Sequence, residues 1–305
     1  MLKYLSIVCA LGLAGCGAGR SNNSGGGGGD GGLSLDYDGS TSSGSDGGQV
    51  GCGAQPKGCY TVYAHGDHEL YRIDLMAKTL VTVGAFNAPM IPSGTKMVED
   101  TITDLAVSPT DVIYAISHTN LYTADAADGH VTLVGAVTAC GTLAVALSFT
   151  PDGKLYTADF KGALCEIDIT ANPPAIVSTL TLGSGLALSG DLVAVGDGTM
   201  YGTAYKLTDT STTSGTQADN LLVKIDPKTG AILQQVGSTG FPKLFGAAFA
   251  LGQVFGFSHD GSGDVVTIDP LTGKGTLFNT FLDPATSKGI SFAGAAVNAD
   301  VSPIQ

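Results

Sequence analysis

The stretch HGDHELYRID, from His65 to Asp74, places two histidines, two aspartates and one glutamate within ten residues. Imidazoles and carboxylates bind zinc and other transition metals, so the stretch could be a metal site. Asp74, however, precedes a turn, and an aspartate there can accept hydrogen bonds from the backbone of that turn. We therefore expect Asp74 to cap its turn, and Asp67 and His68 remain candidate ligand-binding residues.

Four of the five histidines lie in or beside comparable polar loops: His65, His68, His118 and His259. His118 and His259 occupy equivalent positions in two repeats, and Asp67 occupies that position in a third. If these loops meet on one face, they could bind a metal or a polar ligand. No short spacing fixes a ligand geometry, so ordinary loop residues are the alternative interpretation, and the identity of any metal stays open.

Asp104 and Asp191 begin equivalent apolar strands, in DLAVSP and DLVAVG. Two carboxyls that face each other raise each other's pKa and could serve acid–base chemistry or bind calcium, the one cofactor that the sequence suggests. The residues that align with them in two other repeats, Ala146 and Ala247, are apolar, which weakens the case for an active site.

Two connecting segments are unusually long, residues 87–103 and residues 206–220. Long loops on a rigid scaffold often carry binding residues. The first contains Glu99 and Asp100, which could join the carboxyls of the strands that follow.

The elements that hold these residues repeat about every 45 residues. Each repeat reads as four short strands, A to D, and strand C ends in an aspartate: Asp74, Asp125, Asp168, Asp226 and Asp269. Turn signals such as DPKTG follow these aspartates. This pattern predicts an all-β fold, a β-propeller whose blades are the repeats.

The two ends of the repeat region complete the count of blades. The first segment, residues 60–86, has strands B, C and D, and the last, residues 289–299, reads as a lone strand A. Pairing of the last strand with the first blade would close the ring and remove its open edges. We expect five blades, with six as the alternative if residues 206–220 hold another strand pair.

The motifs PDGKLY (residues 151–156) and IDPKTG (residues 225–230) give the chain a general resemblance to bacterial extracytoplasmic propellers of the YVTN, NHL and quinoprotein-like kind. The resemblance covers residues 60–299 and implies the fold, but such motifs occur in proteins of many functions. The chain has no Trp, which departs from quinone-binding blades and from WD repeats.

The amino terminus, MLKYLSIVCALGLAGCGAG, has the layout of a secretory signal at residues 1–15. Its LAGC, residues 13–16, resembles a bacterial lipobox, which implies a lipid anchor on Cys16. Gly17 then favours the outer membrane. Residues 16–51 are rich in Gly, Ser and Asp and should form a disordered tether, and residues 52–305 form the propeller domain.

Four further cysteines, Cys52, Cys59, Cys140 and Cys165, are expected to form disulfides outside the cytoplasm. Three pairings are open, and the nearest neighbours would pair Cys52 with Cys59 and Cys140 with Cys165. The net charge of −13 argues against binding to nucleic acid. We expect a monomer.

Three functions remain open. The favoured one is a lipid-anchored, non-catalytic module that binds a protein or glycan of the cell envelope. The second is a secreted hydrolase or lyase that uses Asp104 and Asp191, although no nucleophile or phosphate-binding motif supports it. The third is a structural envelope protein.

Overall fold

The structure is a computed structural model that describes residues 61–137, 140–141, 143–207 and 219–298. The chain divides into two units, Met1–Gly48 and Gln49–Gln305, and every described residue belongs to the second. The expected signal, the tether, Cys16, Cys52 and Cys59 lie outside the described residues. Within those residues no helix has the length and hydrophobicity needed to cross a membrane.

The described residues form five four-stranded antiparallel sheets and one hairpin. Blade 1 contains, from inside to outside, β22 (Gly294–Ala296), β1 (Thr61–His65), β2 (Glu69–Asp74) and β3 (Thr79–Ala85). Blade 2 contains β6 (Ile102–Val107), β7 (Ile113–Ser117), β8 (Asn120–Ala124) and β9 (Val131–Ala136). Blade 3 contains β10 (Ala144–Phe149), β11 (Leu155–Asp159), β12 (Ala163–Asp168) and β13 (Ala175–Thr181).

Blade 4 contains β14 (Leu186–Ala194), β15 (Met200–Lys206), β16 (Leu221–Asp226) and β17 (Ala231–Ser238). Blade 5 contains β18 (Leu244–Ala250), β19 (Gln253–Ser258), β20 (Asp264–Ile268) and β21 (Gly275–Thr280). The hairpin, β4 (Met90–Ser93) with β5 (Lys96–Glu99), connects blade 1 to blade 2.

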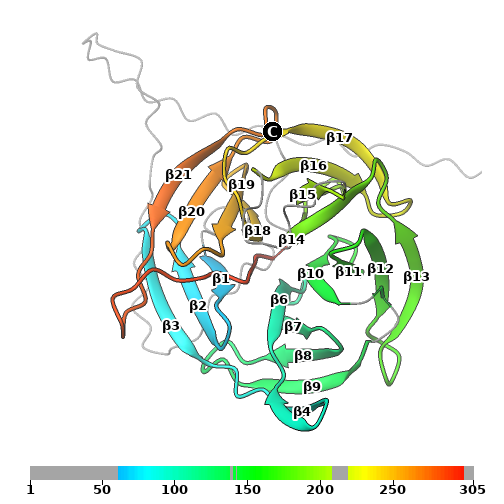
Figure 1. The fold of residues 1–305 in the computed structure, drawn as a ribbon, viewed down its shortest axis with the longest axis vertical. Coiled ribbons are helices and arrows are strands. Elements are labelled where there is room, and N and C mark those ends of the chain that lie inside the picture. Colours follow the sequence, from blue (N-terminus) through cyan, green and yellow to red (C-terminus); the bar gives the residue numbers. More distant parts are fainter. Residues whose placement is uncertain (1–60, 138–139, 142, 208–218, 299–305) are drawn as a thin grey trace, which may run out of the picture. The chain divides into compact units, whose positions relative to one another are not determined.

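The innermost strands close a ring, because β6, β10, β14, β18 and β22 each contact the next and β22 contacts β6 (Figure 1). The predicted five-bladed all-β propeller is confirmed, including its closure by the C-terminal strand. The six-bladed alternative is wrong, since β15 and β16, on either side of the insert at residues 206–220, pair directly within one sheet.

Hydrophobic side chains pack between the blades and hold the ring together. Between blades 5 and 1, for example, Phe257 and Phe292 are fully buried and their rings meet edge to face at 5.5 Å. The five aspartates at the ends of the third strands each accept an N–H from the residue two positions later, as expected for turn caps: Asp74, Asp125, Asp168, Asp226 and Asp269.

The propeller has two distinct faces. The turn face carries the A–B and C–D turns, and the loop face carries the B–C turns and the connections between blades. Thr61 pairs with Asp74 at a C–D turn, so the chain enters the propeller on the turn face. The chain also runs toward the turn face in β22, because Gly294 pairs with His65 and Ala296 pairs with Tyr63.

One predicted disulfide lies within the described residues. Cys140 and Cys165 are bonded, with their Cα atoms 5.8 Å apart, and join the segment before β10 to β12 of the same blade. Both side chains are buried. The expected pairing of these two cysteines is confirmed.

We predict that replacing both cysteines with alanine lowers the free energy of unfolding by about 3.5 kcal/mol, because the bond closes a loop with a sequence separation of 25. Denaturant unfolding followed by circular dichroism measures the loss. Each single alanine variant should lose nearly as much as the double variant, since either breaks the bond. A Cys140→Ala variant with the stability of the natural chain would contradict the prediction.

Candidate functional site

The innermost strands bring five equivalent positions together at the centre of the propeller: Gly294, Asp104, Ala146, Asp191 and Gly246. The strand register corrects one sequence alignment, because Gly246 rather than Ala247 corresponds to Asp104. The two-residue turn between β18 and β19 shifts that pairing by one residue. Four of the five inner strands carry a bulge at this level.

An innermost strand has no neighbouring strand on its channel side, so its N–H groups there need other acceptors. The residue after each equivalent position supplies such an N–H: Leu105, Leu147, Leu192, Ala247 and Ala295. All five donate to the carboxyl of Asp104 or Asp191. The two aspartates therefore tie the five inner strands together at the centre of the ring.

The two carboxyls differ in their hydrogen bonds. Asp191 Oδ1 accepts from Leu192 N at 2.6 Å, and its Oδ2 accepts from Ala247 N at 2.7 Å and from Ala295 N at 3.4 Å. Asp104 Oδ2 accepts from Leu147 N at 2.5 Å. Asp104 Oδ1 is buried without a hydrogen-bond partner.

Burial raises the pKa of both aspartates well above the ordinary value for a carboxyl. The negative charge of Asp191 and a side-chain hydrogen bond between the two carboxyls raise the pKa of Asp104 further, whereas that hydrogen bond lowers the pKa of Asp191. The backbone N–H groups oppose the shift in both residues. Neither side chain has any exposed surface. In this arrangement a ligand on the loop face cannot reach them, so their evident role is to satisfy the inner strands.

His65 lies next to this centre, and its role as a central residue was not foreseen from the sequence. Its side chain is fully buried, Nδ1 lies 2.7 Å from Gly66 O, and Nε2 has no partner. Burial lowers its pKa to about 4. A Cβ added to Gly294 would overlap Asp104 Oδ1 and lie 2.6 Å from His65 Nε2, so both atoms converge on this glycine.

The other predicted loop residues do not form one cluster. His118 Nδ1 lies 3.3 Å from Ala144 O, and His259 Nδ1 lies 3.1 Å from Phe292 O, so each contacts the main chain of the next blade. His68 pairs with Glu99 at 3.3 Å, and Asp67 is exposed. Across the described ranges, no group of three or more His, Cys, Asp or Glu side chains could hold a metal ion.

The long segment before β6 is fixed at its base by Asp100. This carboxyl is buried, and its Oδ2 accepts from Ser117 Oγ at 2.8 Å, Asn120 Nδ2 at 2.8 Å and Tyr122 Oη at 2.6 Å. Burial and the contact with Asp100 raise the pKa of the Tyr122 phenol. Together with the pairing of Glu99 and His68, these contacts fasten the segment to the B–C turns of blades 1 and 2.

The hairpin β4–β5 extends from this base and belongs to none of the five blades; in Figure 1 it lies beyond β9 in the view shown. Met90, Pro92 and Met97 share one of its faces, and Ile91 and Val98 share the other. Met90 is 55% exposed and Met97 is 56% exposed. The unusual length of residues 87–103 marked this segment as a candidate binding loop, but the sequence did not predict a hairpin in it.

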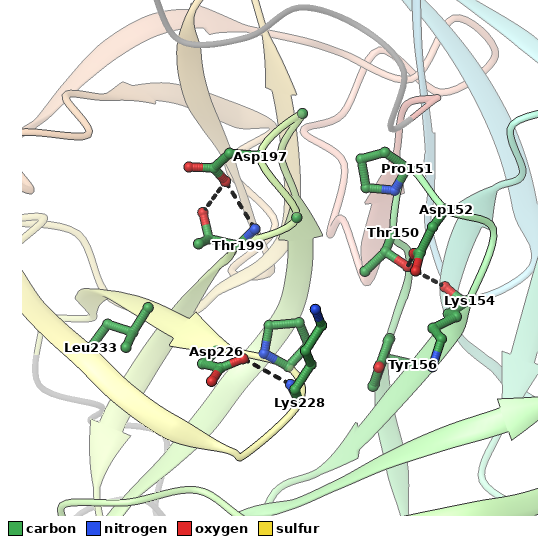
Figure 2. A pocket seen from close by; sticks show the side chains of 13 residues that line it. Thr150, Pro151, Asp152, Lys154, Tyr156, Asp197, Thr199, Asp226, Lys228 and Leu233 are labelled. Atoms are coloured by element: carbon green, nitrogen blue, oxygen red, sulfur yellow. Dashed lines mark hydrogen bonds between the residues drawn. The ribbon is translucent and has the colours of Figure 1, made fainter. Parts of the chain in front are cut away.

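A cleft of about 530 Å³ lies on the turn face between blades 3 and 4. Figure 2 shows its walls, with Asp197 opposite Asp152, and Asp226 beside Lys228. Asp197 accepts from Thr199 N and Thr199 Oγ1, and Asp226 accepts from Lys228 N. These carboxyls therefore stabilise the turns that form the cleft.

Comparison with known proteins identifies one repeat family and, among solved structures, distant matches such as the two below. The family described as "Repeat of unknown function (DUF6923)" matches residues 104–286. No curated protein sequence matches the chain. The Dos1 propeller is 17% identical with a TM-score of 0.43, and the match covers 71% of this chain and 57% of that one. A protein of unknown function from Bacteroides caccae is 13% identical with a TM-score of 0.39, over 78% of this chain and 98% of that one.

We predict that Gly294→Ala lowers the free energy of unfolding by about 2–3 kcal/mol, because the new methyl group would overpack the centre between Asp104 and His65. Gly66→Ala is the matched control, since its Cβ would meet its nearest neighbour, Ser291 O, at an ordinary 3.5 Å. Thermal unfolding of both variants gives the comparison. Equal losses in the two variants would count against a crowded centre.

Proposed function

The chain belongs to the DUF6923 repeat family, and on that premise we propose that it is a non-catalytic binding module, held in the cell envelope by a lipid on Cys16. The outer membrane is the proposed location. The partner is a protein that contacts the hairpin β4–β5 on the loop face.

The observation that carries this proposal is an apolar hairpin that is exposed and yet firmly anchored. Isolated two-stranded hairpins are marginally stable, so this one depends on its base. There the Asp100 carboxylate accepts three side-chain hydrogen bonds. A backbone hydrogen bond also runs from Asp100 N to Pro89 O at 3.0 Å. Methionines in such a position adapt to the apolar surface of a partner.

The alternatives fit the geometry less well. A hydrolase or lyase would need its acids within reach of substrate, and Asp104 and Asp191 have no exposed surface. A purely structural spacer would gain nothing from exposing Met90 and Met97. A glycan would be recognised mainly through polar groups and aromatic rings, whereas the side chains on the hairpin faces are mostly aliphatic.

The hairpin lies on the face away from the point where the described chain enters the propeller. The described chain enters the propeller on the turn face, whereas the hairpin is fastened to turns of the loop face. The LAGC motif and Gly17 support the lipid anchor and the outer membrane.

We predict that Met90→Ser with Met97→Ser reduces partner capture at least tenfold. A photo-crosslinking residue at Val98 in the full chain, expressed in cells, should give a discrete protein adduct that this double substitution abolishes. Leu133→Ser with Val177→Ser is the matched control, because these outer-strand residues are equally exposed, at 57% and 55%. Loss of the adduct in both pairs, or capture of glycan alone, would overturn the hairpin as the protein-binding surface.

We predict that Cys16→Ser abolishes acylation and releases the chain from the membrane fraction. Two or three acyl chains hold a protein on a bilayer almost permanently, whereas a chain without them has no such hold. Labelling with radioactive palmitate and membrane fractionation measure both effects, with Ser21→Ala as the control. Palmitate incorporation that survives the substitution would refute the anchor while leaving the hairpin proposal standing.

A further inference from the structure

We propose that the carboxyls of Asp104 and Asp191 hold one proton between them at neutral pH, that it resides on Oδ1 of Asp104, and that its loss at higher pH loosens the centre of the propeller. The pair would then be a pH-sensitive clamp built into the ring. This inference does not depend on the proposed binding function.

The hydrogen bonds decide which carboxyl carries the proton. Both oxygens of Asp191 already accept backbone N–H groups, so a proton on either would face another donor. Oδ2 of Asp104 accepts from Leu147 N. Only Oδ1 of Asp104 is without a partner, so it is the one position where a proton removes an unfavourable contact instead of creating one.

A proton on Oδ1 also finds acceptors nearby. The Nδ1 of His65 lies 2.7 Å from Gly66 O, so it carries the ring hydrogen and leaves Nε2 as an acceptor without a partner. Oδ1 and Nε2 converge on Gly294. A side-chain hydrogen bond also joins the carboxyls of Asp104 and Asp191, and it raises the pKa of Asp104 and lowers that of Asp191. A proton on Oδ1 therefore turns a buried acceptor without a partner into a donor.

Among the described residues, no other group near the pair offers a counter-charge. At the same level β10, β18 and β22 place Ala146, Gly246 and Gly294, which do not titrate. On β1, burial lowers the pKa of His65 to about 4, so His65 is neutral at pH 7. The ionisable groups that act on His65 are Asp67 and His259. Two ionised carboxylates here would be buried together without a cation.

The sign of the pH effect follows from linkage. Burial raises the pKa of both aspartates in the folded chain, so the folded chain binds more protons than the unfolded chain above about pH 4. Stability must therefore fall as pH rises toward the folded pKa of the pair. For one proton, the ratio of folded to unfolded chain falls by up to about tenfold per pH unit.

Asp104→Asn and Asp191→Asn in the full chain test the proposal through unfolding measured from pH 5 to pH 9. In Asp104→Asn, the amide oxygen can replace Oδ2 and the NH₂ can replace the protonated Oδ1. We expect the decline with pH to shrink to less than about twofold per unit. In Asp191→Asn the NH₂ must face backbone donors, so the variant should be less stable at every pH. The control is Asp219→Asn, an exposed site with the same change in charge.

An infrared band of a protonated carboxyl at pH 7 that disappears in Asp104→Asn would support the proposal independently. Several results would overturn it: a normal pH decline in Asp104→Asn, a folding failure of that variant, or a greater loss in Asp104→Asn than in Asp191→Asn. Stabilisation of the natural chain by calcium or zinc, absent in Asp104→Asn, would replace the proton with a metal ion.

Discussion

Five strand edges converge at the centre of this propeller, and each brings a backbone N–H that has no strand to bond with. An unpaired buried N–H costs about 1–3 kcal/mol, so the centre could not close without acceptors. Two carboxyls, from Asp104 and Asp191, accept from all five inner strands. The small residues Gly294, Ala146 and Gly246 at the other three positions leave the room that these two side chains occupy.

In this arrangement, acidic residues at the centre of the propeller have a structural role and do not indicate an active site. Converging carboxyls with raised pKa values are a usual mark of an active site. Here the same electrostatic signature arises because the acids are enclosed and bonded to the main chain. The centre is thus a structural element in which buried negative charge is unfavourable, and the proposed proton on Asp104 removes one of the two negative charges.

The surface of the chain is organised differently. Among the described strands, β4 and β5 pair only with each other, and Asp100 and Glu99 fix the hairpin to the B–C turns of two blades. A buried carboxylate with three side-chain donors is a rigid anchor. Its effect is to hold Met90 and Met97 in solvent at a defined position, which is the basis of the proposed binding role.

The sequence by itself determined the repeat, the strand pattern and the closure. Alternation of apolar residues and a turn aspartate every 45 residues or so are local signals, and local signals specify strands and turns. The pairing of Cys140 with Cys165 was also foreseen as the nearer of the open pairings. Only the tertiary structure showed that Asp104 and Asp191 bond to the backbone of other blades, that His65 reaches the same glycine, and that Asp100 supports a hairpin. These contacts join residues from different blades, and their geometry depends on how the blades pack around the centre, which no local pattern in the chain encodes.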